Sequence, residues 1–146
     1  MGFALPAGMG AKVALPNENV WVVTGDGSFQ MNFQELGTIA QEQIAVKTII
    51  INNGYLGMVR QWQEFFYEHR YSASPIGCPD FVMIGQAYGI KSLRVTEKAD
   101  VTAALREAAD HPGPALIDFQ VEGEENVYPM IPPGGSLSDI IIEPSH

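Results

Sequence analysis

The chain has 146 residues, 46% of them hydrophobic, which favours a single globular domain with a real core over a disordered chain. Its formal net charge of −9 argues against binding to nucleic acid or to an anionic membrane surface, because no basic stripe is present. Cys78 is its single cysteine, so no disulfide framework can form, and we expect a cytoplasmic protein.

The first fifteen residues are small and mostly apolar, which predicts a helix that packs closely against a sheet. Pro6 suits the first turn of such a helix. The segment lacks the cationic start of a signal or transit peptide. Residues 16–19 read as a turn that leads into a short β-rich run, residues 20–24.

A second β-rich run covers residues 46–51, and the segment between the two runs has the periodicity of a helix, residues 32–43. The apolar positions that recur on one face of this helix are Phe33, Leu36, Ile39 and Ala40. Strand, helix and strand of this length form a βαβ unit with parallel strands. We therefore predict an α/β fold with an open parallel sheet and helices on both faces.

Polar motifs follow both predicted strands. Gly25-Asp26-Gly27 comes after the first strand, and Asn52-Asn53-Gly54 ends the second. Because neighbouring parallel strands end at one edge of the sheet, both motifs should meet where open α/β sheets hold ligands.

The types of residue in these motifs indicate what they bind. The glycines let main-chain N–H groups approach a ligand closely, and the amino end of the following helix favours phosphate. Asp26 would repel phosphate unless a cation lies between them, and Mg²⁺ fits that place. Asn52 or Asn53 can supply a neutral amide oxygen. The residues therefore predict a site for Mg²⁺ and a diphosphate.

Other readings of the two motifs are open. Taken singly, Gly-Asp-Gly and Asn-Asn-Gly are each typical of a simple turn. A nicotinamide site is disfavoured because no Gly-x-Gly-x-x-Gly follows a strand, and no Walker-type Gly-Lys-Ser/Thr occurs. The pairing of Gly-Asp-Gly and Asn-Asn-Gly across one βαβ unit favours a shared binding site over two separate turns.

Four more predicted elements follow residue 70. Asp80 is a candidate N-cap for a short helix, residues 81–88. After a strand at residues 90–95, Thr96 is the candidate cap of an amphipathic helix, residues 97–109, and residues 115–121 form the last strand. No internal repeat or second domain boundary is visible.

At this point the sequence resembles a known family. The motif from Gly25 to Asn53 looks like the thiamine diphosphate motif of thiamine-dependent enzymes. Within that superfamily, residues 56–72, which read LGMVRQWQEFFYEHRYS, are similar to the catalytic subunit of acetolactate synthase (acetohydroxyacid synthase). The similarity runs over nearly the whole chain and implies a three-layer, Rossmann-like domain that binds thiamine diphosphate.

The resemblance implies roles for individual residues. For the Mg²⁺ ion it implies the side chains of Asp26 and Asn53 and the main-chain carbonyl of Tyr55. The residues implied in cofactor binding are Gly25, Gly27, Ser28, Met1 and Met58. Met1 would align with a bulky apolar residue that supports the bent cofactor, and Trp62 with Met58 would contact the second 2-oxo acid.

The resemblance also implies the activity of a larger enzyme. The family condenses pyruvate with a second pyruvate or with 2-oxobutyrate, with loss of CO₂, in branched-chain amino-acid biosynthesis. It implies 2-oxo acid substrates, a homo-oligomer, a regulatory small subunit as a further partner, and FAD bound mainly by a domain absent from this chain.

Residues 1–146 are expected to form one domain that is truncated at its amino end. The family supplies its catalytic glutamate from an amino-terminal domain, so we expect no certain catalytic residue here and an isolated chain that is inactive. Residues 122–146 correspond to a tail that closes over the active site in the family and is expected to be mobile without cofactor.

Two alternatives stay open. The chain can be the diphosphate-binding subunit of another thiamine-dependent 2-oxo acid decarboxylase, in which the domains occur as separate chains. It can also be a non-catalytic remnant that keeps the fold without the cofactor. The sequence around Trp62 argues for the acetolactate synthase interpretation.

Overall fold

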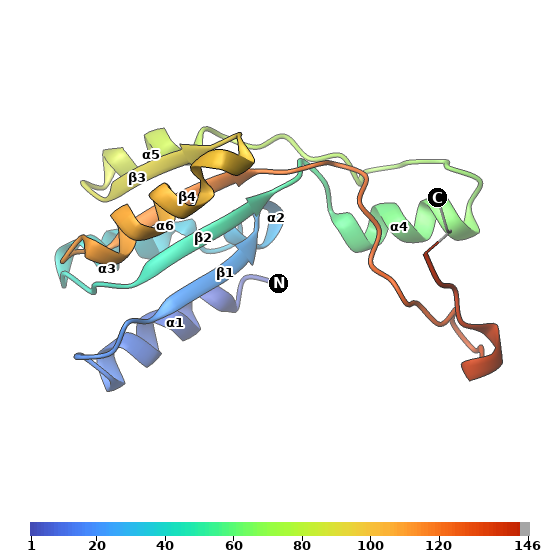
Figure 1. Ribbon diagram of the computed structural model, residues 1–146, viewed down its shortest axis with the longest axis horizontal. Coiled ribbons are helices and arrows are strands. Elements are labelled where there is room, and N and C mark those ends of the chain that lie inside the picture. Colours follow the sequence, from blue (N-terminus) through green and yellow to red (C-terminus); the bar gives the residue numbers. More distant parts are fainter. Residues whose placement is uncertain (144–146) are drawn as a thin grey trace.

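A four-stranded parallel sheet forms the centre of the computed structural model, which describes residues 1–143 (Figure 1). The strands are β1 (Trp21–Gly25), β2 (Lys47–Asn52), β3 (Lys91–Val95) and β4 (Ala115–Gln120). Their order in the sheet is β1-β2-β4-β3, and every pair is parallel. The prediction of an open parallel α/β sheet is thus confirmed.

Helices cover both faces of the sheet. On one face, α1 (Ala4–Ala14), α3 (Leu36–Gln41) and α5 (Phe81–Ala87) enclose the larger core. Its buried residues include Leu5, Val22, Leu36, Ile50, Phe81 and Leu116. On the other face, α6 (Val101–Asp110) packs over β3 and β4 through a smaller core that contains Val95, Ala104, Ala108 and Ile117. Among the described residues, no helix is both long and apolar enough to cross a membrane.

The helix expected over residues 32–43 is divided. The chain turns from β1 directly into the single turn α2 (Asp26–Phe29), and a 3-10 turn (Phe33–Glu35) then leads into α3. Asn32 lies between these turns with a non-helical φ of −141°, and its side-chain amide donates to the carbonyl oxygen of Gly2. A side chain that bonds to a distant part of the backbone competes with the helix at this point.

The two predicted helix caps have different outcomes. Asp80 caps α5 as expected, because its carboxylate accepts a hydrogen bond from the backbone N–H of Met83 at 3.0 Å. The prediction for Thr96 is wrong. A 3-10 turn (Lys98–Asp100) precedes α6, and no side chain caps the amino end of this turn or of α6.

An arm extends beyond the carboxyl ends of the strands (Figure 1). The arm consists of α4 (Gly57–Phe66), the return loop at residues 67–76 and the described part of the carboxyl tail, residues 122–143. The tail runs alongside α4 and contains one 3-10 turn (Leu137–Asp139). The arm is thus built from segments that directly follow β2 and β4.

Candidate functional site

The two polar motifs leave the sheet side by side. Strands β1 and β2 are neighbours, and Gly25 pairs with Ile51 in their register. The motif that starts at Gly25 and the motif that ends β2 therefore emerge at the same edge of the sheet, as the sequence predicted.

Asp26 connects the two loops. The residue is 2% exposed, and one carboxylate oxygen, Oδ1, accepts the backbone N–H of Gly27 at 2.7 Å. The other oxygen, Oδ2, accepts the backbone N–H of Gly54 at 2.7 Å, from the loop after β2. A carboxylate has about four lone-pair positions, two on each oxygen, so Oδ1, which accepts the one hydrogen bond from Gly27, keeps the capacity to bind a cation.

Asn52 and Asn53 point to different partners. Asn52 is buried and donates its side-chain amide to Asp118 at 3.0 Å. Asn53 accepts the backbone N–H of Tyr55 through Oδ1 at 3.1 Å, which holds the loop in a tight turn around Gly54, where φ is +72°. Of the two asparagines, Asn53 lines a pocket together with Asp26.

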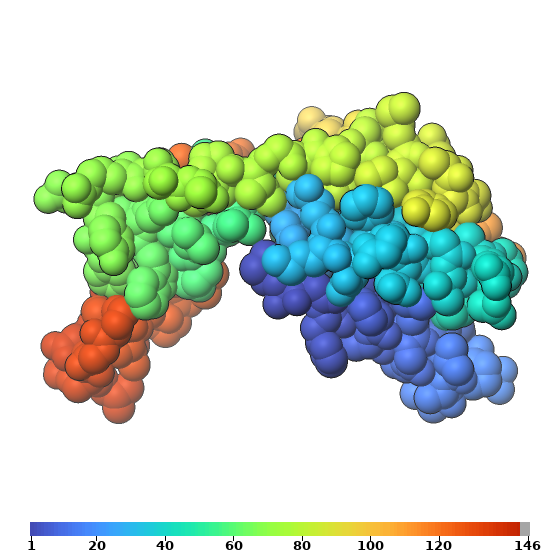
Figure 2. Space-filling view, turned by 180° about the vertical axis from the view of Figure 1, so that it is seen from behind, coloured from blue at the N-terminus to red at the C-terminus, as the bar shows by residue number. Residues whose placement is uncertain are grey.

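That pocket has a volume of about 330 Å³ and brings together nearly all of the predicted site residues. Its lining contains Gly25, Asp26, Gly27, Ser28, Asn53, Tyr55, Met58 and Met1. Figure 2 shows the N-terminal part of the chain, in blue, facing the arm, in green and red, across a hollow. Trp62 is the one predicted site residue outside this lining.

The N-terminal residues are fastened to the first motif. The backbone N–H of Gly2 donates to Ser28 Oγ at 2.9 Å, and Asn32 binds the Gly2 carbonyl from the other side. These contacts bring the Met1 side chain beside Gly27, with Cε 3.6 Å from the position where a Cβ would stand. Met1 thus adds an apolar side chain to a pocket that also contains the Asp26 carboxylate.

Little room is available beside Gly27. A Cβ at this position would lie 2.8 Å from Leu56 Cδ2 and 3.1 Å from Ile76 Cδ1. At Gly25, in contrast, a Cβ would meet no atom within 4 Å. Leu56 and Val59 also line the pocket, and sequence reasoning did not assign them to it.

The atoms of this pocket that could bind a metal ion are hard oxygen ligands. Three of the residues that line the pocket are Asp26, which has a carboxylate, Asn53, which has an amide, and Tyr55, whose main chain has a carbonyl oxygen. Mg²⁺ prefers such ligands and is usually held by one or two carboxylates plus phosphate oxygens. The oxygen atoms of these residues would therefore suit a Mg²⁺ ion.

Met58 links this pocket to a second, apolar one. It also lines a hollow of about 470 Å³ together with Val59, Trp62, Gln63 and Tyr67. Trp62 is 38% exposed and packs edge-on against Phe66, with ring centroids 5.7 Å apart. The structure thus places Trp62 next to the first pocket through Met58.

The sequence did not predict that the Cys78 thiol contacts Asp26. Cys78 Sγ donates to Asp26 Oδ2 at 3.4 Å from a loop that is distant in sequence. Burial, together with the neighbouring Asp26 carboxylate, raises the pKa of the Cys78 thiol to about 12, so the thiol stays protonated and remains a donor. No local pattern in the sequence marks this contact.

A larger hollow of about 610 Å³ lies on the other side of the loop that carries Asn53. Asp118 in its wall is 1% exposed and accepts hydrogen bonds from Asn52, Arg94 and Gln120. Arg94 also pairs with Asp80 at 2.7 Å. These polar groups satisfy one another, so the network stabilises the carboxyl ends of β2, β3 and β4.

Comparison with known proteins gives a consistent picture. Residues 1–119 match the family model described as thiamine pyrophosphate enzyme, C-terminal TPP binding domain. The chain is 53% identical over 143 residues to the acetolactate synthase large subunit of Pyropia yezoensis. It is 46% identical over 142 residues to the acetolactate synthase isozyme 2 large subunit of Escherichia coli strain K12. Each alignment covers 97% of this chain.

A solved structure shares the fold. The thiamine diphosphate-dependent 4-hydroxybenzoylformate decarboxylase of Rhodococcus jostii RHA1 superposes with a TM-score of 0.79 at 32% identity. The match covers 86% of this chain and 24% of the decarboxylase. The chain likewise spans only 24% of the Pyropia subunit and 26% of the Escherichia coli subunit.

Proposed function

The chain belongs to the thiamine pyrophosphate enzymes, as their C-terminal TPP-binding domain, and we propose that it holds thiamine diphosphate through a Mg²⁺ ion in an acetolactate synthase. The observation that carries this proposal is the contact between the two motifs. Asp26 bonds to the backbone of Gly54, and Asn53 lines the same pocket.

Within the proposed site, each residue has a role that follows from its chemistry. Asp26 and Asn53 would bind Mg²⁺ through side-chain oxygens, and Tyr55 through its main-chain carbonyl. Backbone N–H groups around Gly25, Gly27 and Ser28, at the start of α2, would bind the diphosphate, since a glycine backbone can approach phosphate closely. Met1 and Met58 would contact the apolar part of the cofactor.

When bound, thiamine diphosphate would supply a carbon nucleophile that adds to a 2-oxo acid and an electron sink for the electron pair that remains when CO₂ leaves. The residues of this chain would hold the diphosphate end and keep water from the apolar side of the pocket. Trp62 and Met58 would contact the second 2-oxo acid, which is pyruvate or 2-oxobutyrate in our proposal. Their shared apolar hollow supports this role.

Other parts of the proposal concern the whole enzyme. We propose a homo-oligomer with a regulatory small subunit, FAD held outside this chain, and a cytoplasmic location, where a lone thiol stays reduced. Residues 1–146 would act as one domain that makes no acetolactate by itself. The expected mobility of the tail, residues 122–146, stays a prediction. Because Asn126 and Val127 are hydrogen-bonded to α4, a motion of this part of the tail would have to include α4. The last three residues of the tail lie outside those described.

Genetic complementation tests the proposed activity. The complete gene that encodes this chain should restore growth without valine and isoleucine to a bacterium that lacks acetolactate synthase. A copy with Asp26→Asn, expressed to the same level, should fail. If the unaltered gene does not restore growth although its product is present, another thiamine-dependent 2-oxo acid decarboxylase becomes the better assignment.

A further inference from the structure

We propose that Gln61 is a positioning residue that fastens residues 125–130 of the carboxyl tail to α4 and thereby keeps the exposed Trp62 face of this helix in place. The attachment itself follows from contacts in this chain. Its meaning for the second 2-oxo acid rests on the proposed function, because that proposal gives Trp62 its role.

Helix α4 lacks the features that stabilise a helix by itself. It has ten residues, no side chain caps its start, and its first turn holds no acidic residue. Isolated helices shorter than about 12–15 residues are only marginally stable in water. The helix also extends away from the sheet (Figure 1). Its order must therefore come from the other segments of the arm.

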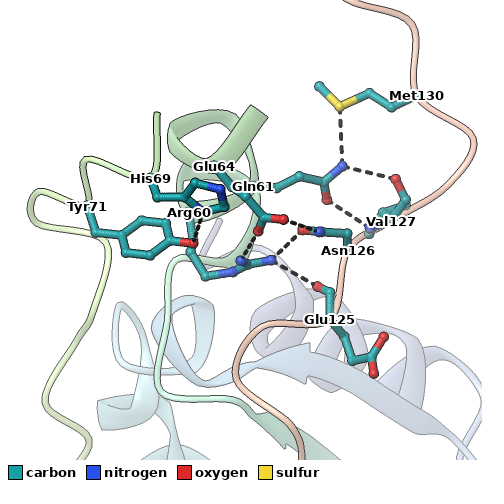
Figure 3. A network of polar contacts seen from close by, with 9 residues as sticks. All are labelled: Arg60, Gln61, Glu64, His69, Tyr71, Glu125, Asn126, Val127 and Met130. Atoms are coloured by element: carbon teal, nitrogen blue, oxygen red, sulfur yellow. Dashed lines mark hydrogen bonds and ion pairs between the residues drawn. The ribbon is translucent and has the colours of Figure 1, made fainter. Parts of the chain in front are cut away.

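The Gln61 carboxamide makes a reciprocal pair with the tail (Figure 3). Its Nε2 donates to the carbonyl oxygen of Val127 at 3.0 Å, and its Oε1 accepts the N–H of Val127 at 2.8 Å. Gln61 is 1% exposed, so these bonds are shielded from water. Losing them would leave buried polar groups without partners, which is costly.

A buried charge lies beside this pair. Arg60 is fully buried, pairs with Glu64 one turn along α4, and donates to the side chain of Asn126 and to the carbonyl oxygen of Glu125 at 3.3 Å. Asn126 in turn donates to Glu64 at 2.9 Å. A buried guanidinium needs such partners, and the tail supplies two of them, both to Nη2, while Nε has no hydrogen-bond partner among the described residues.

The opposite side of α4 offers a matched comparison. Gln63 makes the same reciprocal pair, but with Ser72 of the return loop, at 2.9 Å and 3.1 Å. Two glutamines on one helix thus each bind a backbone segment through both carboxamide atoms, and Gln61 is the one that reaches the tail. Trp62 lies between them in sequence and presents its ring to the apolar hollow.

Hydrogen exchange of the full chain tests the attachment. Gln61→Met keeps the length of the side chain and removes both hydrogen bonds. We expect the Val127 amide to exchange at least about tenfold faster than in the wild type, and the backbone of α4 to lose protection with it. Gln63→Met should accelerate the Ser72 amide and leave Val127 unchanged. The denaturation midpoint of the sheet should stay the same in both variants.

Fluorescence of Trp62 tests the consequence for the helix face. In a Trp21→Phe background Trp62 is the remaining tryptophan, and Gln61→Met should make it about twofold more accessible to acrylamide. Should Gln61→Met fail to fold, Gln61→Glu keeps the acceptor for Val127 and removes only the donor, and it should change both signals in the same direction.

Two results would overturn the proposal. One is a Val127 amide that exchanges equally fast in the wild type and in the Gln61 variant. The other is an equal acceleration of Val127 by the Gln63 variant. Because both measurements are made without substrate, they do not depend on the acetolactate synthase assignment, which complementation tests separately.

Discussion

Asp26 connects the local fold with the candidate site. The same carboxylate binds the backbone of its own loop, the backbone of Gly54 and the thiol of Cys78, and it lines the pocket. Replacing it therefore affects both the joining of the loops and the proposed cation site. Asp26→Asn keeps the size of the side chain and removes its charge, but its NH2 group also replaces one of the two acceptor oxygens, so the fold of this variant must be checked together with its cation binding.

The lowered pKa of Asp80 leads to a prediction about the pH dependence of stability. The Met83 backbone N–H and then the Arg94 guanidinium hold the pKa of the Asp80 carboxyl below its usual value. A carboxyl whose pKa is lower in the folded state stabilises the fold above its unfolded pKa, and this contribution is lost as pH falls through the folded value. Asp80→Asn should thus lower the free energy of unfolding at pH 7.

Urea denaturation at several pH values measures this effect. The difference between wild type and Asp80→Asn should shrink as pH falls below about 4, where the carboxyl takes up its proton in the unfolded chain. A difference that stays constant down to pH 2 would rule out a charge-dependent contribution of Asp80.

The sequence predicted which residues line the pocket better than it predicted their hydrogen-bond partners. Asp26 and Asn53 were chosen because each follows a strand in a recognisable motif. The choice between Asn52 and Asn53 was open from the residues alone, since it depends on Asp118, which lies 66 positions further along the chain. The thiol of Cys78 was missed for the same reason, because its contact with Asp26 spans 52 positions.

Helix α1 approaches strand β1 closely at Gly8, which has no side chain. A Cβ at Gly8 would lie 2.0 Å from Val22 Cγ2, whereas a Cβ at Gly10 would meet no atom within 4 Å. Gly8→Ala should therefore destabilise the chain by about 1–3 kcal/mol through overpacking. Gly10→Ala should stabilise it by about 0.5–1 kcal/mol, because alanine is the better helix former.

The free energies of unfolding of the two glycine variants check this contrast. The same substitution is made in the same helix, so the helix propensity gained is similar and the packing differs. Equal stabilities of Gly8→Ala and Gly10→Ala would show that α1 does not approach β1 as closely as described.

The elements were predictable where their signal is local. The parallel βαβ unit follows from periodicity and from the length of its connection, and Asp80 was recognisable as a cap. The break at Asn32 was not, because it arises from a bond to Gly2, far along the chain. Thr96 resembled a cap in sequence, but a 3-10 turn at Lys98–Asp100 starts this region instead.

At the scale of the whole molecule, the chain consists of a sheet that carries the polar loops and an arm that carries the apolar hollow. The arm could not be predicted in detail. Gln61 and Val127 are 66 positions apart, and no period of a helix or strand relates them. Met58 belongs to the lining of both pockets, so the proposed cofactor site and the proposed acceptor site meet at the base of the arm.

The proposed cofactor binding requires a cation held by Asp26 and Asn53, and calorimetric titration with thiamine diphosphate tests this most directly. The chain should bind the cofactor when Mg²⁺ is present and not in excess chelator. Asp26→Asn should lose this metal-dependent binding, while Asp80→Asn, the same chemical change outside the pocket, should bind like the wild type. Equal affinity of the wild type and Asp26→Asn, or binding that does not depend on Mg²⁺, would contradict the account.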